Sequence, residues 1–242
     1  MKTAKLLALG LLLMAAVYAK PLLLIIDASG SMEDTLPSGE TKIATAKSVA
    51  TETINSYNDQ IALMVYTDCD SGGDPMSGSI IVSNAFTTDK SALTSKVSEI
   101  TANSDTPLAN SITEGVLYAK QNGGGAQIVI LTDGLETCDG DISGAIQSAE
   151  QQGINVKLVG FALSEEDKQN ISSAVTSAGG SYYDAGDELG LQQAFTQAVQ
   201  TTTPTSGGST YDPYGSSASD SSCASFMGIL GLVFAGAYIC RR

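Results

Sequence analysis

The sequence of 242 residues contains no histidine, and basic residues number 12 against 26 acidic ones. Without histidine, the Ser-His and Cys-His pairs that activate protein nucleophiles cannot form. A G-x-S-x-G turn, the setting of many hydrolase serines, is also absent. The formal net charge of −14 excludes a nucleic-acid partner, because too few cations are present to displace phosphate counterions. These absences favour a binding protein over an enzyme.

Cysteine is scarce too, with four residues, and the cell compartment decides whether they can pair. The N-terminus has the pattern of an export signal. Lys2 and Lys5 precede a run of apolar residues, and Val17-Tyr18-Ala19 fits cleavage after Ala19. We therefore expect residues 1–19 to be a signal peptide and the mature chain to be exported, where disulfides persist.

Residues 20–200 alternate short apolar runs with amphipathic stretches, which is typical of crossover units around a mostly parallel sheet. Central strands are expected at Leu22–Ile26, Ile61–Tyr66, Ile128–Leu131 and Val156–Phe161, and a more polar edge strand at Ser79–Phe86. Helices are expected at Lys42–Tyr57, Lys90–Ile100, Leu108–Gln121, Ile142–Gln152, Glu165–Ser177 and Leu189–Val199. The pattern predicts one α/β domain.

The C-terminal part changes character twice. Residues 201–222 are rich in Ser, Thr, Gly and Pro, which predicts a flexible linker. Residues 223–242 contain an apolar stretch from Phe226 to Cys240 and end in two arginines, which predicts a membrane anchor or a sorting tail that is cut during surface delivery. The stretch is shorter than the roughly 20 residues that usually cross a bilayer, and a buried terminal helix is the third alternative.

Chemistry-bearing residues follow two of the expected strands. Asp27-Ala28-Ser29-Gly30-Ser31 comes directly after the first strand, and Thr132-Asp133-Gly134 follows the strand Ile128–Leu131. Ligands in open α/β sheets collect beyond the carboxyl ends of the strands. Thr106 lies in a loop just before an expected helix. Carboxylate and hydroxyl oxygens are hard ligands that suit a hard divalent cation.

This arrangement resembles the von Willebrand factor type A domain and its metal-ion-dependent adhesion site, in which D-x-S-x-S is followed by a Thr and then an Asp. The resemblance runs from about Leu22 to Val199. It implies a three-layer, Rossmann-like fold with a mostly parallel central sheet, one antiparallel edge strand and helices on both faces. It also implies a divalent-cation site, with Mg²⁺ as the first choice and Mn²⁺ or Ca²⁺ as alternatives. By resemblance, three hydroxyls would contact the metal directly and two carboxylates through water: Ser29, Ser31, Thr106, Asp27 and Asp133. One departure is Asp105, where many relatives have Gly.

The function that the resemblance implies is metal-dependent capture of a protein partner. Two aspartates would balance a divalent ion, and an Asp or Glu carboxylate of the partner would fill an open coordination position. Three alternatives stay open. The metal could only stiffen a surface scaffold, or it could support hydrolysis, although no spare general base is identifiable. The Asp and Ser residues could also do no more than cap helices and shape turns.

The loops at the carboxyl ends of the expected strands also carry two cysteines and many acidic residues. Cys69 and Cys138 are the two cysteines of the globular part, and both follow strands that end at the metal-bearing edge. A Cys69–Cys138 disulfide is therefore expected and would contribute about 4 kcal/mol by loop closure; two free thiols are the alternative. Acidic residues should crowd the same rim, mostly as solvated loop residues: Glu33, Asp34, Asp68, Asp70, Asp74, Glu136, Asp139 and Asp141.

Overall fold

The computed structural model describes residues 20–66, 68–69, 79–81, 85–103 and 105–200. The expected signal peptide (1–19), linker (201–222) and C-terminal anchor or sorting tail (223–242) lie outside these residues. In the part of the chain that is described, no helix is long and apolar enough to span a bilayer.

The centre of the fold is a sheet of five parallel strands in the order β2-β1-β4-β5-β6, and a short sixth strand, β3, pairs antiparallel with β2 at one edge. The strands are β1 (Leu22–Asp27), β2 (Ile61–Tyr66), β3 (Ser79–Ile81), β4 (Gln127–Thr132), β5 (Val156–Phe161) and β6 (Ser181–Ala185). Every residue of β1, β2, β4 and β5 is buried. Mostly apolar runs therefore form central strands that are covered on both faces.

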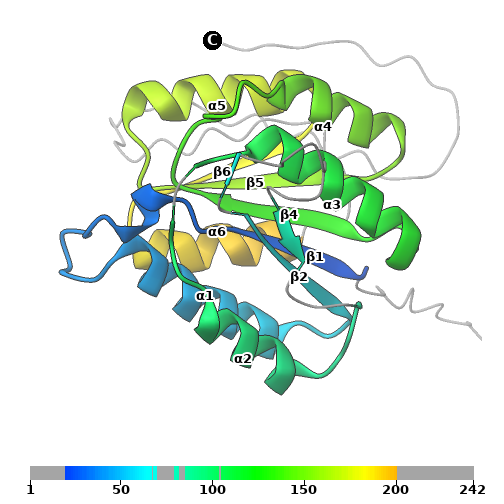
Figure 1. The fold of residues 1–242 in the computed structure, drawn as a ribbon, viewed down its shortest axis with the longest axis horizontal. Helices are drawn as coiled ribbons and strands as arrows, with labels where there is room; N and C mark the ends of the chain where they lie inside the picture. Colours follow the sequence, from blue (N-terminus) through cyan, green and yellow to red (C-terminus); the bar gives the residue numbers. More distant parts are fainter. Residues whose placement is uncertain (1–19, 67, 70–78, 82–84, 104, 201–242) are drawn as a thin grey trace, which may run out of the picture. The chain divides into compact units, whose positions relative to one another are not determined.

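Helices connect the parallel strands and lie in two layers (Figure 1). The helical elements are η1 (Gly30–Glu33), α1 (Lys42–Ser56), α2 (Lys90–Glu99), α3 (Leu108–Asn122), α4 (Ile142–Gln151), α5 (Glu165–Ser177) and α6 (Glu188–Gln200). Four of the α-helices begin after a residue whose side-chain oxygen accepts a backbone N–H of the first turn: Thr41, Asp89, Asp141 and Ser164. Such caps replace hydrogen bonds that the helix itself cannot make.

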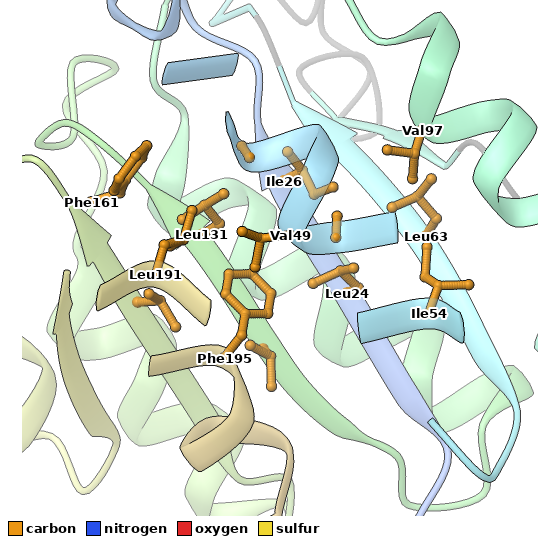
Figure 2. Close-up of a cluster of buried hydrophobic side chains, with 14 of the residues drawn as sticks. Leu24, Ile26, Val49, Ile54, Leu63, Val97, Leu131, Phe161, Leu191 and Phe195 are labelled. Carbon is orange, nitrogen blue, oxygen red and sulfur yellow. The ribbon is translucent and has the colours of Figure 1, made fainter. Parts of the chain in front are cut away.

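Two hydrophobic cores lie on opposite faces of the sheet. Strand β1 contributes to both, because Leu24 and Ile26 point to one face and Leu23 and Ile25 to the other. The first core packs against α1, α2 and α6, and Figure 2 shows its side chains meeting between these helices and the sheet. The second core packs against α3, α4 and α5. Helix α3 approaches the sheet closely, since a Cβ at Gly115 would lie 2.8 Å from Cδ1 of Ile25.

The sequence-based elements differ from the structure at the two edges of the sheet. Strand β6 was not expected. Its residues alternate poorly, and four of the five are partly or fully exposed, so no buried apolar run marks it. At the other edge, the expected strand Ser79–Phe86 is a strand over Ser79–Ile81, residues 82–84 lie outside the described residues, and Ala85 and Phe86 are not in a strand. Edge strands are covered on fewer sides and therefore leave a weaker hydrophobic pattern.

A buried polar network lies at the opposite end of the sheet from Asp27. The Nζ of Lys157 donates to Oε1 of Gln127 at 2.9 Å and to the carbonyl of Ala198 at 2.5 Å. Gln127 in turn donates to the hydroxyl of Tyr57 at 2.8 Å and to the carbonyl of Val199 at 3.2 Å. Lys157 is 2 % exposed. The network therefore joins β4 and β5 to the last carbonyls of α6, which carry partial negative charge.

We expect stability to respond to pH through Lys157. Burial, and then the charge of Lys20, lowers the pKa of Lys157 from 10.5 to about 8. Between these two values the unfolded chain binds more protons than the folded chain, so the free energy of unfolding should gain a contribution as pH rises. Urea unfolding at several pH values should show this gain in the wild type and not in Lys157→Met. Parallel pH profiles for the two proteins would contradict the expectation.

Candidate functional site

The candidate site lies where β1 and β4 end. These strands are neighbours and run parallel, so their carboxyl ends lie at the same edge of the sheet. Asp27 is the last residue of β1 and Thr132 the last of β4. Ser29 directly precedes η1, and Ser31 lies within it. The topology thus brings residues together that are about a hundred positions apart in sequence.

Asp27 is the most enclosed of the candidate residues, with 0 % exposure. Its Oδ1 accepts the backbone N–H of Ser29 at 2.8 Å, which shapes the turn after β1. Its Oδ2 accepts the hydroxyl of Thr132 at 2.7 Å and, at 3.4 Å, the backbone N–H of Asp133. Burial first, and the charge of Asp133 second, raises the pKa of Asp27. Donors from two strand ends therefore fix this carboxylate in place.

Ser29, Ser31 and Asp133 form a chain of oxygen atoms. The two serine Oγ atoms lie 3.1 Å apart, and the hydroxyl of Ser31 donates to Oδ1 of Asp133 at 2.7 Å. Ser29 directly precedes η1, yet its side chain makes no capping hydrogen bond to that helix. Helix capping therefore does not account for Ser29. Asp27, in contrast, does shape a turn, because its carboxylate accepts the N–H of Ser29.

Thr106 reaches the same place from the loop before α3. It is 4 % exposed. Its Oγ1 and the Oγ of Ser31 lie 3.7 and 3.8 Å from the point that a Cβ of Gly134 would occupy. The absence of a side chain at Gly134 leaves the space beside both hydroxyls open. All five candidate residues named from the sequence are thus brought to one place.

The backbone of Thr106 is held by a residue that the sequence did not single out. Its N–H donates to Oγ1 of Thr137 at 2.7 Å, and the N–H of Thr137 donates to its carbonyl at 3.1 Å. Glu136 braces the same loop. It accepts the N–H of Ala109, in the first turn of α3, and the N–H of Cys138, both at 2.7 Å. Thr137 and Glu136 therefore position the loop that carries Thr106.

Three of the acidic residues expected to be solvated in the loops have hydrogen-bond or ion-pair partners instead. Glu136 braces the Thr106 loop, and Asp141 caps α4 through the N–H of Gly144. Asp34 lies 3.6 Å from the ammonium of Lys42. These three carboxylates are already paired with donors or a cation. Asp70 and Asp74 lie outside the described residues.

The expected disulfide between Cys69 and Cys138 is present, with Cα atoms 5.4 Å apart. That separation is within the usual range for a disulfide. The alternative of two free thiols is therefore wrong for this structure. The bridge ties the chain that follows β2 to the loop that follows β4. Because Cys138 is next to Thr137, the covalent link ends one residue from the contact that holds Thr106.

Residues 22–207 match the von Willebrand factor type A domain. The chain belongs to this family. Its A domain is 24% identical over 182 residues to "Uncharacterized protein YwmC" of Bacillus subtilis (strain 168), a match that covers 72% of this chain and 80% of the relative.

Solved structures share the fold of this A domain. The pilus adhesin SpaC of Lactobacillus rhamnosus GG is similar with a TM-score of 0.60 at 15% identity, over 76% of this chain and 30% of SpaC. Proximal thread matrix protein 1 of the mussel byssus, solved "with zinc occupied MIDAS motif", is similar with a TM-score of 0.54 at 13% identity, over 75% of this chain and 45% of that one. The chain thus spans less than half of either solved protein, and at these identities the likeness establishes the fold alone.

Proposed function

We propose that the A domain is an exported binding module that captures an acidic group of a protein partner through a divalent cation. The cation would be held at the end of β1 by the hydroxyls of Ser29, Ser31 and Thr106, with the carboxylates of Asp27 and Asp133 beside it. The single observation that carries this proposal is the convergence of these oxygen atoms from three separate loops.

The spacing of the oxygen atoms fits a small hard cation. Neighbouring ligands of an octahedral Mg²⁺, each about 2.1 Å from the metal, lie about 3.0 Å apart. The Oγ atoms of Ser29 and Ser31 lie 3.1 Å apart. The donor set consists only of hydroxyl and carboxylate oxygens, which suits Mg²⁺ and Mn²⁺ better than softer metals. When bound, the cation would offer a coordination position to an anionic oxygen of a partner.

Export is part of the proposal. The disulfide supports it, since such bonds persist in oxidising compartments and are rare in the cytosol. We propose that residues 1–19 are removed, that residues 20–200 form the binding domain, and that residues 201–222 tether it to a C-terminal anchor or sorting tail at 223–242. The fold likeness to a pilus adhesin is consistent with a surface location.

The proposal is tested with arrays of acidic peptides. Each peptide carries one central Asp or Glu, and its matched control carries Asn or Gln there. The purified protein should bind members of the acidic set in Mg²⁺, release them in EDTA, and ignore the amide controls. Equal binding in EDTA would favour the scaffold in which the metal is only structural. Consumption of a peptide in Mg²⁺, followed by mass spectrometry, would favour the hydrolase.

We expect Thr137→Val to weaken metal binding because it removes the hydroxyl that accepts the N–H of Thr106. An unpaired donor in a partly buried loop costs about 1–3 kcal/mol, so the loop that carries Thr106 should become less ordered. Calorimetry should report weaker Mg²⁺ binding, and urea unfolding in EDTA separates this from a general loss of stability. Thr196→Val is the matched control, since its hydroxyl bonds a carbonyl within α6. Equal Mg²⁺ affinity in both variants would refute the positioning role.

A further inference from the structure

A lysine contacts the candidate metal site directly. The Nζ of Lys42 donates to Oδ2 of Asp133 at 2.8 Å, while Oδ1 of Asp133 accepts the hydroxyl of Ser31. The side chain of Lys42 is 12 % exposed and that of Asp133 is 0 % exposed. Asp34, the second acidic neighbour of Lys42, lies farther away at 3.6 Å and is 70 % exposed. The main partner of Lys42 is therefore the buried carboxylate.

The position of Lys42 in its helix is unfavourable by itself. It is the first residue of α1, directly after the capping residue Thr41. Helix N-termini carry partial positive charge, so a cation there is repelled. The side chain nevertheless lies against Asp133 instead of extending into solvent. The attraction to Asp133, and more weakly to the exposed Asp34, offsets this repulsion.

The charge of Lys42 matters differently in the two states of the site. In the metal-free protein, Asp27 and Asp133 are enclosed, at 0 % and 6 % exposure of the whole residue, and Lys42 pairs with the negative charge of Asp133. Enclosed charges need such a partner, because desolvation is costly. With a divalent ion bound, the two aspartates already balance the metal. The charge of Lys42 then leaves the enclosed groups of the site with net positive charge, because the charge of Asp34 is 70 % exposed and screened by solvent.

We infer that Lys42 is a built-in cation of this site, which holds Asp133 in the metal-free protein and makes the metal-loaded site selective for an anionic ligand. The inference rests on the proposed function and deepens it. It also changes one expectation from the sequence, in which the loaded site was close to neutral. An acidic partner would be attracted by this charge in spite of the acidic loops around it.

Removing the charge of Lys42 should strengthen metal binding but weaken both anion binding and the stability of the metal-free protein. Lys42→Met should bind Mn²⁺ more tightly, on the order of tenfold, because a cation next to Asp133 no longer repels the metal. The same variant should bind acetate at the loaded site more weakly. It should also unfold at a lower urea concentration in EDTA, because the enclosed carboxylate of Asp133 loses its partner. A purely structural lysine would lower stability without tightening metal binding.

The experiment titrates Mn²⁺ by electron paramagnetic resonance into the full-length protein, then adds acetate and follows the water proton relaxation of bound Mn²⁺. Lys42→Arg, which keeps the charge, should behave like the wild type. The matched control is Lys47→Met on the same helix, because its Nζ bonds the carbonyls of Ser98 and Ile100 instead of a carboxylate of the site. Should Lys42→Met not fold, Lys42→Gln removes the charge and keeps a donor.

The outcomes distinguish a failure of the role of Lys42 from a failure of the proposed metal binding. If the wild type binds Mn²⁺ and Lys42→Met binds it equally or more weakly, the inference is wrong and the metal proposal stands. If Lys42→Met and the wild type bind acetate equally, Lys42 does not select the ligand and the inference is also wrong. If the wild type takes up no Mn²⁺, the metal proposal fails and the inference fails with it.

Discussion

Asp27→Asn should abolish the stabilisation of the protein by Mg²⁺. At a hundredfold excess over its Kd, a ligand that binds only the folded state adds about 2.7 kcal/mol to the free energy of unfolding. Asp27 should be essential for this gain because it is fully enclosed at the site and is held by donors from both strand ends. The amide has nearly the same shape but lacks the negative charge. Urea unfolding in Mg²⁺ and in EDTA measures the gain for each protein.

Because unfolding in Mg²⁺ is compared with unfolding in EDTA for the same protein, the effect of the substitution on the stability of the metal-free protein cancels. That effect has two opposing parts, since the amide relieves the repulsion from Asp133 but accepts fewer hydrogen bonds than the carboxylate. Asp59→Asn makes the same change of charge just before β2, where the strands begin. This control should keep the full gain in Mg²⁺. A gain of equal size in Asp27→Asn would remove Asp27 from the site.

Replacing both cysteines of the bridge should lower the free energy of unfolding by about 4 kcal/mol, the loop-closure figure for a bridge that spans tens of residues; here the two residues are 69 positions apart. The variant is Cys69→Ser with Cys138→Ser, because single substitutions leave a reactive thiol. Urea unfolding in EDTA measures the loss without any contribution from metal. We also expect weaker Mg²⁺ binding, because the bridge ends next to Thr137, which holds Thr106.

Reducing the disulfide and replacing its cysteines should lower the free energy of unfolding by the same amount. The wild type in a strong reductant should unfold at the same urea concentration as the double serine variant, and the variant should not respond to the reductant. Alkylation of the non-reduced protein, followed by mass spectrometry of the peptides, should leave Cys69 and Cys138 unmodified. If both become alkylated without reductant, the protein does not contain the bridge.

The sequence was sufficient for the parts of the fold that are buried on both faces. Apolar runs, interrupted only by Lys157, marked β2 and β5 at their observed bounds, because a central parallel strand has no solvent-exposed face. The strand β6 left no such signal, since most of its residues are half exposed. The pattern of apolar residues in a sequence reflects burial, and it therefore does not predict strands that are only partly buried.

The same limit applies to the site. Asp27 and Asp133 could be found because each lies at the carboxyl end of an apolar strand, and neighbouring strand ends meet in a parallel sheet. Lys42 and Thr137 could not be found in this way. Lys42 begins a helix, where a lysine is usually solvated, and its contact with Asp133 spans 91 positions. Thr137 acts through a hydrogen bond between two loops, and no spacing rule predicts how loops meet.

The most direct test of the metal site is an anomalous difference map from a crystal of the protein soaked in Mn²⁺. We expect one strong peak within coordination distance of the hydroxyl oxygens of Ser29, Ser31 and Thr106, at the point where the loops after β1 and β4 approach the start of α3. A map without a peak there, or with manganese bound only at other carboxylates, would contradict the account.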